Sequence, residues 1–134
     1  MSKEVLTSMK PIIDANHFPN FNGVVISEVE EDEAFGYVEL NENSMNSYGI
    51  CHGGCYFTLA DTTAGIAARS NGEMYVTESA NMNFIKAAKG TKIISHAKVI
   101  NRGKNICLLE CTITDELDNL LCKGTFSYFH IEAK

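Results

Sequence analysis

The alternation of apolar and polar positions predicts a helix, two strands, a second and longer helix, and four further strands. Apolar residues recur at helical spacing from Val5 to Ile13, with Pro11 close to the end of that segment. Residues 16–22 have the composition of a turn. Segments 23–29 and 34–40 are rich in residues that favour strands, and the acidic stretch between them predicts a solvated hairpin loop.

Residues 54–70 form the most apolar segment of the chain and predict a helix that the rest of the fold must cover on most sides. Its small residues would let strands approach closely: Ala60, Ala64, Gly65, Ala67 and Ala68. The pair Asn71-Gly72 tolerates a left-handed backbone and predicts the end of the helix.

Four strands are predicted after the helix, at residues 75–85, 92–101, 106–115 and 121–131. The links between them are short, which favours antiparallel neighbours over crossover connections. The predicted architecture is therefore α+β, with an antiparallel sheet that curls around one long helix. Both prolines lie near the start and no linker interrupts the chain, so residues 1–134 are expected to form a single domain, with 1–20 as an N-terminal helix and turn.

Composition narrows the class of protein. The chain has 134 residues, is 45% hydrophobic and 21% charged, and carries a formal net charge of −6, values typical of a globular domain and unlike those of a general nucleic-acid binder. No apolar run approaches the ~20 residues of a membrane span, and residues 1–14 lack the apolar core of a signal peptide. We expect a cytoplasmic protein whose five cysteines are reduced and which binds neither nucleic acid nor membrane.

Asp61 is the only acid inside the apolar helix segment. A carboxylate in such surroundings must find hydrogen-bond donors, take up a proton or remain near water, and such a cost is often linked to function. The alternative is a polar stripe along one edge of the helix. His52-Gly53-Gly54 precedes the helix, where backbone N–H groups can stabilise a developing oxyanion. The alternative there is a histidine that fixes the loop and glycines that relieve crowding.

Two other chemistries receive less weight. Cys51, His52 and Cys55 include metal-binding residue types, but no second close pair at zinc-like spacing follows, so no metal site is predicted. A nucleophilic Cys51 with His52 as its base ranks below Asp61. The Arg102-Gly103-Lys104 loop is basic in an otherwise acidic chain, and it gains meaning only if the ligand carries phosphate.

The run from Asn46 to Asp61 resembles the signature of hotdog-fold acyl-CoA thioesterases (the 4HBT superfamily), and most of all their phenylacetate-degradation, or PaaI-like, branch. The similarity extends over residues 21–130. It implies a hotdog fold, in which a curved antiparallel sheet wraps a long central helix. It also implies a homodimer that joins two sheets edge to edge and shares its active sites, and commonly a homotetramer built from two such dimers.

The resemblance assigns roles to particular residues. Asp61 matches the catalytic carboxylate, which either attacks the thioester or activates water. The other catalytic positions are Gly53, whose N–H polarises the carbonyl; His52, which steadies that turn; Asn46, which positions the nucleophile or water; and Ser79, which in some relatives holds the attacking water. The expected substrate and CoA contacts are Gly54, Thr62, Phe84, Arg102, Gly103 and Lys104. Residues 85–90 lack a proline found in many relatives, which leaves CoA contacts at Lys86 and Lys89 open.

The expected reaction is hydrolysis of an acyl-CoA thioester to a carboxylic acid and CoA. It requires no metal or redox cofactor, and CoA itself is part of the substrate. A non-catalytic acyl-CoA-binding regulatory module is the main alternative, and no DNA-binding appendage is visible. A hydratase on the same fold is the second, but its Asp and His pattern is not found. The identity of the acyl group stays open, as does the choice between CoA and carrier-protein thioesters as substrates. The aromatic residues Tyr48, Tyr56, Phe57 and Phe84 either line an aryl pocket or pack the core, and packing is favoured.

Overall fold

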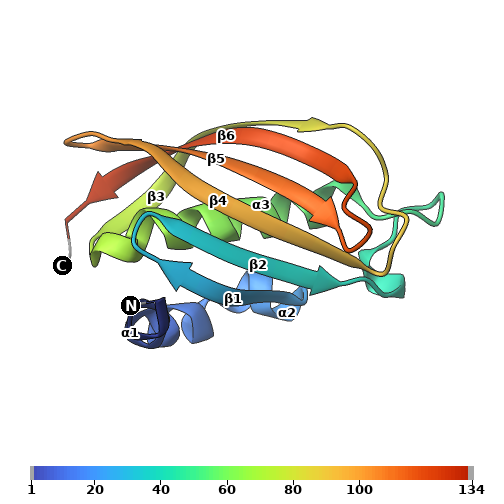
Figure 1. Cartoon of the computed structure of the whole chain (residues 1–134), viewed down its shortest axis with the longest axis horizontal. Coiled ribbons are helices and arrows are strands. Elements are labelled where there is room, and N and C mark those ends of the chain that lie inside the picture. Colours follow the sequence, from blue (N-terminus) through green and yellow to red (C-terminus); the bar gives the residue numbers. More distant parts are fainter. Residues whose placement is uncertain (1, 133–134) are drawn as a thin grey trace.

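The computed structural model describes residues 2–132, with side chains from residue 5 onward (Figure 1). The helices are α1 (Ser2–Ala15), α2 (His17–Phe21) and α3 (Gly53–Ala68). The strands are β1 (Val24–Glu30), β2 (Glu33–Glu39), β3 (Met74–Phe84), β4 (Lys92–Arg102), β5 (Ile106–Asp115) and β6 (Leu120–Ile131). Two 3₁₀ turns, η1 (Glu42–Ser44) and η2 (Arg69–Asn71), flank the α3 region. The predicted element order is confirmed, apart from the short α2, where a turn was predicted, and η1.

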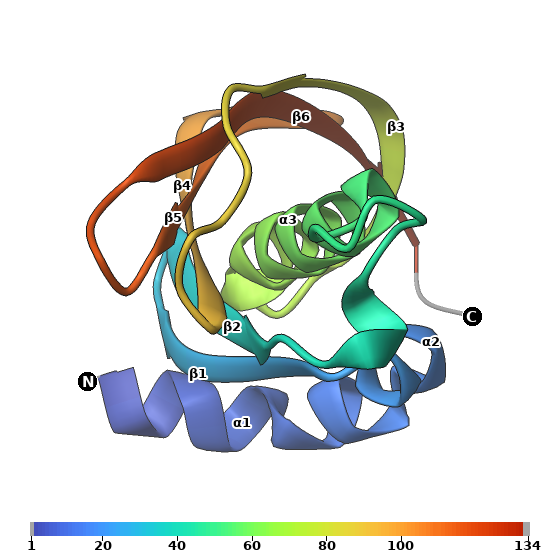
Figure 2. The ribbon, with the colours of Figure 1, turned by 90° about the vertical axis from the view of Figure 1, so that its right-hand side faces the viewer.

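All six strands form one antiparallel sheet in the order β1-β2-β4-β5-β6-β3. The sheet curves around α3, and α1 and α2 lie outside it, below β1 in the view of Figure 2. This arrangement confirms the expected α+β hotdog fold with a long central helix and a curved antiparallel sheet. Within residues 2–132, no helix has the length and apolarity needed to cross a bilayer.

The neighbours of β3 differ from the prediction. Short links do join β4 to β5 and β5 to β6, as predicted, but β3 pairs with β6 and not with β4. The link at 85–91 crosses the ends of β6 and β5. The N–H groups of Ile85 and Lys86 donate to the carbonyl oxygen of Leu121 at 2.7 and 3.2 Å, and the Lys89 N–H donates to Asp115 at 3.2 Å. Side-chain and backbone acceptors along this path make a short crossover possible.

The core lies between α3 and the concave face of the sheet. Burial alternates along β5 from Ile106 to Asp115, as expected for a strand with one face turned inward. α3 is buried over most of its length, which agrees with its apolar sequence. One polar contact crosses this core, between the hydroxyls of Thr63 and Ser95, both fully buried and 2.6 Å apart.

Gly36 on β2 makes room for that polar contact. A Cβ atom at Gly36 would lie 2.9 Å from Thr63 Oγ1 and 3.1 Å from Ser95 Oγ, closer than side chains tolerate. The glycine therefore allows the strand to approach α3 where the two hydroxyls meet. The helix is thus joined to the sheet by a specific hydrogen bond as well as by apolar packing.

Candidate active site

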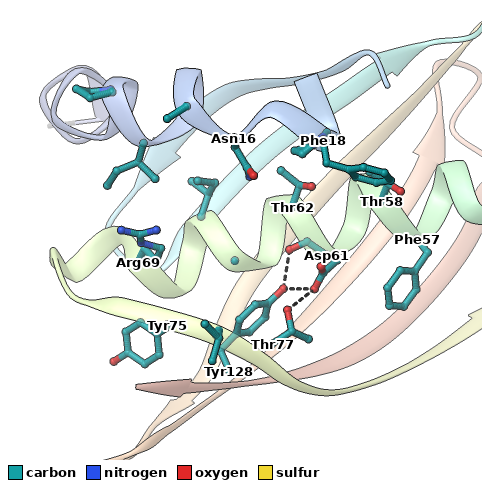
Figure 3. A pocket seen from close by; sticks show the side chains of 17 residues that line it. Asn16, Phe18, Phe57, Thr58, Asp61, Thr62, Arg69, Tyr75, Thr77 and Tyr128 are labelled. Atoms are coloured by element: carbon teal, nitrogen blue, oxygen red, sulfur yellow. Dashed lines mark hydrogen bonds between the residues drawn. The ribbon is translucent and has the colours of Figure 1, made fainter. Parts of the chain in front are cut away.

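Asp61 lies near the middle of α3, and its side chain is only partly buried. Its carboxylate Oδ1 accepts hydrogen bonds from Thr77 Oγ1 at 2.9 Å and from Tyr128 Oη at 2.6 Å (Figure 3). Within the described residues, Oδ2 has no hydrogen-bond donor. One carboxylate oxygen is thus fixed by two hydroxyls, while the other is available to a ligand.

Tyr128 remains a hydrogen-bond donor over the physiological pH range. Burial, and then the charge of Asp61, raise the pKa of the Tyr128 phenol well above its ordinary value. Its ring packs against Gly65 on α3, where an added Cβ would lie 3.4 Å from the ring. The tyrosine therefore holds Asp61 from the β6 side, and Thr77 holds it from β3.

A cavity of about 830 Å³ opens beside Asp61 between α3, β3 and the N-terminal helices. Its walls are mostly apolar, with Thr58 and Thr62 from α3 and Arg69 from η2 as further polar residues (Figure 3). The full lining is Pro11, Ile12, Ala15, Asn16, Phe18, Pro19, Phe57, Thr58, Asp61, Thr62, Gly65, Ile66, Arg69, Tyr75, Val76, Thr77 and Tyr128. A cavity of this size and character can hold an organic acyl group with its reactive end at the carboxylate.

The start of α3 is the second part of the site. His52 is the N-cap, and its Nδ1 accepts a hydrogen bond from the Gly54 N–H at 2.7 Å. The next two amides, of Cys55 and Tyr56, donate to the His52 carbonyl oxygen at 2.9 and 3.4 Å. The Gly53 N–H alone among these first-turn amides has no acceptor in the part of the chain that the structure describes. His52 therefore orders the turn, as expected, and leaves one donor for a ligand.

Asn46 organises the loop that leads to this turn. Its Oδ1 accepts hydrogen bonds from the Tyr48 N–H at 2.9 Å and from the Ile50 N–H at 3.3 Å. Its backbone N–H also donates to the Ile50 carbonyl oxygen at 2.8 Å. Within the chain, Asn46 thus orders the loop before α3. Its predicted role in positioning water or a nucleophile stays a prediction.

Thr77 and Tyr128 are the functional residues that the sequence did not reveal. The family resemblance predicts Ser79 as the functional hydroxyl of β3, but the hydrogen bond to Asp61 comes from Thr77. Ser79 lies beyond an irregularity in the β3–β6 register and is exposed, and its predicted role with the attacking water stays a prediction. Tyr128 is distant in sequence, and only the pairing of β6 with β3 brings it beside Asp61.

The residues of the basic loop, Arg102, Gly103 and Lys104, differ in their surroundings. The Arg102 guanidinium turns inward, where it contacts Asp32 at 2.8 Å, the Ala68 carbonyl oxygen at 2.9 Å and the Tyr75 hydroxyl at 3.1 Å. It therefore closes the C-terminal end of α3. Gly103 and Lys104 are exposed in the turn between β4 and β5. CoA contacts by these three residues stay predictions, and the inward contacts of Arg102 give it a structural role as well.

Gly54, Thr62 and Phe84 were the other predicted substrate contacts. Thr62 lines the cavity beside Asp61, whereas Gly54 lines a neighbouring cavity of about 700 Å³ together with His52 and Thr58. Phe84 is 55% exposed, and its ring edge would lie 3.7 Å from a Cβ atom added to Gly53. The structure thus places one of the three next to the carboxylate and two next to the start of α3.

The aromatic residues divide between packing and the cavity. Tyr56 is buried in the core, where its hydroxyl accepts a hydrogen bond from the Ala88 N–H at 3.0 Å. Phe57 lines the cavity, and Tyr48 is exposed on the loop that precedes α3. The expectation of core packing therefore holds for Tyr56, while Phe57 contributes to the cavity wall.

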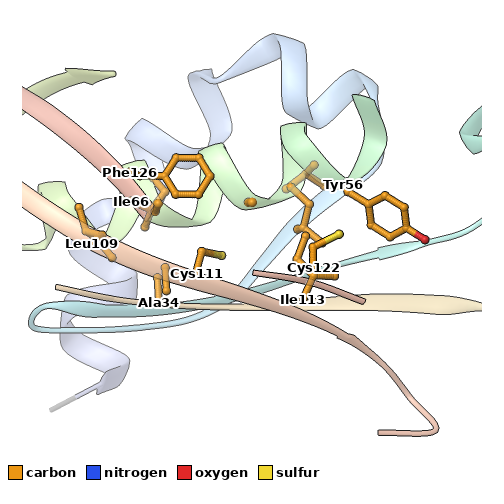
Figure 4. Close-up of a cluster of buried hydrophobic side chains, with 14 of the residues drawn as sticks. Ala34, Tyr56, Ile66, Leu109, Cys111, Ile113, Cys122 and Phe126 are labelled. Carbon is orange, nitrogen blue, oxygen red and sulfur yellow. The ribbon is translucent and has the colours of Figure 1, made fainter. Parts of the chain in front are cut away.

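The cysteines are unpaired thiols, and most of them pack in the core (Figure 4). Burial raises the pKa of Cys111 and of Cys122 to about 12. A hydrogen bond with Cys55, and then burial, raise the pKa of Cys51 far above its ordinary range, which disfavours Cys51 as a nucleophile. Among the described residues, no three His, Cys, Asp or Glu side chains are grouped so that they could hold a metal ion.

Comparison with known proteins identifies relatives over most of the chain. Residues 48–122 match the family model of the thioesterase superfamily. A 1,4-dihydroxy-2-naphthoyl-CoA hydrolase of Listeria monocytogenes is 30% identical over 75% of this chain and 84% of its own length. The acyl-coenzyme A thioesterase PaaI of Escherichia coli is 28% identical over 68% of this chain and 67% of its own length. The matched regions span 66% to 84% of the first relatives compared.

Solved structures agree with this relationship. The structure of E. coli PaaI superposes with a TM-score of 0.92 over 99% of this chain and 97% of that chain, at 19% identity, which supports the fold. A thioesterase of Streptococcus pneumoniae, solved with coenzyme A, has a TM-score of 0.79 at 27% identity over 85% of this chain and 93% of that chain. The chain therefore has the hotdog fold, belongs to the thioesterase superfamily and is a thioester hydrolase.

Proposed function

We propose that the protein hydrolyses an acyl-CoA thioester and that Asp61 is the catalytic carboxylate. The observation that carries this proposal is the asymmetry of the carboxylate beside a cavity of acyl-group size: Thr77 and Tyr128 fix Oδ1, while none of the described residues donates to Oδ2. Oδ2 either attacks the thioester carbonyl or removes a proton from the water that attacks it. In both routes the C–S bond breaks and CoA leaves as the thiol. The general-base route releases the carboxylic acid directly, whereas direct attack leaves an acyl–Asp61 anhydride that a water molecule hydrolyses to the acid and free Asp61.

The Gly53 N–H is the proposed donor to the developing oxyanion, and helix geometry supports a donor from a second copy of the chain. Gly53 and Asp61 are eight positions apart on α3, which separates their backbones by about 12 Å. Both groups must lie about 3 Å from the reacting atoms. One protomer therefore supplies Asp61 and its partner supplies the Gly53 turn.

Strand β3 is the proposed edge for this pairing. It is the last strand of the sheet, eleven residues long and largely exposed. A long exposed edge strand is a template for pairing with another chain. We propose a homodimer that joins two β3 strands and so brings Asp61 of one protomer near the Gly53 turn of the other, with a homotetramer of two such dimers as the larger assembly.

The relatives support acyl-CoA as the substrate class. Two of them are named as hydrolases of CoA thioesters, and the streptococcal thioesterase was solved with coenzyme A. Two further structures of that thioesterase contain single alanine substitutions. One substitution replaces an aspartate, and the other replaces a threonine sixteen positions later. Asp61 and Thr77 have the same separation in this chain. The choice between CoA and carrier-protein thioesters stays open. A cytoplasmic location stays a prediction, which the unpaired cysteines support.

A thiol-release assay tests the proposal directly. Purified protein is incubated with short, long and aryl acyl-CoA thioesters, and free CoA is measured with a thiol reagent. Asp61→Asn keeps the shape of the side chain but cannot act as base or nucleophile, so we expect its kcat to fall at least about a thousandfold. Circular dichroism confirms that the variant is folded.

Two outcomes would reject this proposal. Undiminished turnover by Asp61→Asn would remove Asp61 as the catalyst. Tight acyl-CoA binding by the wild type without any thiol release would instead support the non-catalytic regulatory module.

A further inference from the structure

Arg69 lies at the opposite end of the Asp61 cavity from the start of α3. The face of α3 that lines the cavity carries Thr58, Thr62 and Gly65 at the spacing of successive helical turns, and Arg69, the first residue after α3, also lines the cavity. Figure 3 shows the Arg69 side chain in the space between α3 and the N-terminal helices. The cavity that contains the catalytic carboxylate therefore also contains one cationic group.

The Arg69 guanidinium lacks the partners that such a group usually has. Its Nε is buried and has no hydrogen-bond acceptor among the described residues. None of the carboxylates described in residues 5–132 lies within ion-pair distance of it. A buried charged donor without an acceptor is unfavourable, so an acceptor from a ligand would satisfy it.

Arg69 is the C-cap residue of α3 through its backbone, but the end of the helix does not require the Arg69 side chain. The guanidinium of Arg102 already donates to the Ala68 carbonyl oxygen at 2.9 Å and pairs with Asp32 at 2.8 Å. Two arginines thus lie at the same end of the helix, but of these two side chains only that of Arg102 donates a hydrogen bond to it within the described part of the chain. This contrast leaves the cavity as the place where the Arg69 guanidinium can find an acceptor.

The path from Asp61 to Arg69 is open and apolar. Gly65 stands four residues from each of them and contributes no side chain, and Ile66 and Val76 line the same cavity. Asp61 and Arg69 are eight positions apart, which corresponds to about 12 Å along the helix, and arginine side chains lean toward the helix N-terminus, which shortens the span. An acyl chain of about six to ten carbons fits this length.

We propose that Arg69 binds a carboxylate at the far end of the acyl group, so that the preferred substrates are ω-carboxyacyl-CoA thioesters. This inference rests on the proposed function and adds the chemical class of the acyl group. The guanidinium can bind a carboxylate with two parallel hydrogen bonds, which selects for that group over a terminal methyl. Apolar walls between the two ends accept the methylene chain.

A matched substrate series tests this inference. For each chain length of about six to ten carbons, kcat/KM is measured for the ω-carboxyacyl-CoA and for the methyl-ended acyl-CoA. The wild type is expected to prefer the carboxylated member by about tenfold to a hundredfold, the effect of a hydrogen bond to a charged group. Arg69→Met is expected to abolish the preference, and Arg69→Lys is expected to keep part of it.

Lys98→Met is the control for the loss of a positive charge, because Lys98 is exposed on β4 and outside the cavity. It is expected to keep the wild-type preference. Equal or greater activity of the wild type on methyl-ended substrates overturns the inference while leaving the proposed function intact, as does an unchanged preference in Arg69→Met. If these two series resist hydrolysis while other acyl-CoA thioesters are hydrolysed, the inference fails and the proposed function stands. If no acyl-CoA thioester is hydrolysed, including the short, long and aryl substrates of the first assay, the proposed function fails and the inference fails with it.

Discussion

The hydroxyl oxygen of Tyr128 lies 2.6 Å from both the backbone carbonyl oxygen and the carboxylate Oδ1 of Asp61. A tyrosine has one hydroxyl proton, so the two acceptors share a single donor. The contact ties the side chain of Asp61 to its own backbone through a residue from β6. Asp61 is therefore held in one rotamer by a strand that is distant in sequence.

Replacing Tyr128 by Phe should separate this positioning role from packing. The phenyl ring retains the contact with Gly65, but the donor to Asp61 is lost. We expect kcat to fall about tenfold to a hundredfold. Steady-state thiol release measures the effect, and thermal denaturation shows whether the fold is retained. A folded variant with wild-type kcat would show that the hydrogen bond is dispensable.

Thr77→Val and Ser79→Ala distinguish the two hydroxyls of β3. Valine has nearly the shape of threonine but removes the donor to Asp61 Oδ1, so we expect kcat to fall about tenfold. Ser79 has no contact with Asp61 among the described residues, and its alanine variant reports the predicted role in holding water. A larger loss in Ser79→Ala than in Thr77→Val would reverse the order that the structure gives.

Gly53→Pro removes one hydrogen-bond donor with little change to the helix. Gly53 is the first residue of α3, a position where proline is tolerated, and His52 before it has the extended backbone that proline favours (φ −68°, ψ 140°). We expect kcat to fall about a hundredfold to a thousandfold, the effect of losing an oxyanion donor. Gly53→Ala keeps the N–H and has space for its Cβ, so it should stay active. Equal losses in both variants would assign the effect to shape.

Mixing Gly53→Pro with Asp61→Asn tests whether sites are shared between protomers. A mixed dimer has one site with an intact Asp61 from one chain and an intact Gly53 N–H from the other. Equal co-expression with random pairing should restore about a quarter of wild-type activity. The measurement is thiol release by the co-purified mixture, compared with each variant alone. Activity no higher than that of the single variants would place both groups in one chain.

Arg102 and Lys104 are expected to differ in what they control. Arg102→Met loses the contacts to Asp32, Ala68 and Tyr75, and should lower the free energy of unfolding by about 1–2 kcal/mol, with little from the half-exposed ion pair itself. Lys104→Met should instead raise KM for acyl-CoA without changing stability, because Lys104 is exposed and is the residue of this loop predicted to bind a CoA phosphate. Chemical denaturation and steady-state kinetics on both variants check this division. A stable Arg102→Met with raised KM would assign CoA binding to Arg102.

Stability should fall in acid through Asp115, whose carboxylate accepts hydrogen bonds from Lys89, Leu117 and Asn119. Burial alone would raise the pKa of Asp115, but the hydrogen bonds, first of all from the Asn119 side chain, lower it to about 2. The folded-state pKa is below the unfolded value of about 3.9, so this stabilisation is complete above pH 4 and is lost as the pH falls toward 2.

Thermal denaturation from pH 7 to pH 2 measures this dependence. Asp115→Asn should be less stable than the wild type at pH 7 and should lose less stability between pH 4 and 2. Some dependence should remain, because backbone hydrogen bonds from Thr91 lower the pKa of Glu116 to about 2 as well. Parallel curves for the two proteins in this range would remove Asp115 as a source of the acid sensitivity.

The elements of the fold could be predicted because each carries a local signal. Apolar spacing indicated α1, unbroken apolar composition indicated α3, and the strands agreed with the structure to within a few residues. The order of the sheet could not be derived in this way. The link at 85–91 is short enough for a hairpin, and it crosses the sheet end because Leu121, Tyr56 and Asp115 provide partners for its backbone.

The candidate site shows the same division. Asp61 and the His52-Gly53 turn could be identified because a lone acid and paired glycines are conspicuous beside an apolar helix. Thr77 and Tyr128 have no such signal, since a threonine and a tyrosine are ordinary strand residues. Their role depends on a register between β3 and β6 that only the three-dimensional structure defines.

The buried pair of Thr63 and Ser95 has a consequence for the chemistry at a distance. The buried side of α3 consists mostly of small residues, and packing of such residues alone fixes the rotation of a helix about its own axis only weakly. Each rotation would turn Asp61 toward a different wall. Thr63 Oγ1 keeps the Leu59 carbonyl oxygen, 2.8 Å away in the same helix, as an acceptor at any rotation. Ser95 meets Thr63 at one rotation only, and a helix turned by one residue would take that partner away from the Ser95 hydroxyl in an apolar interior. The direction in which the carboxylate points is therefore encoded partly on the opposite side of the helix, by residues that never meet the substrate.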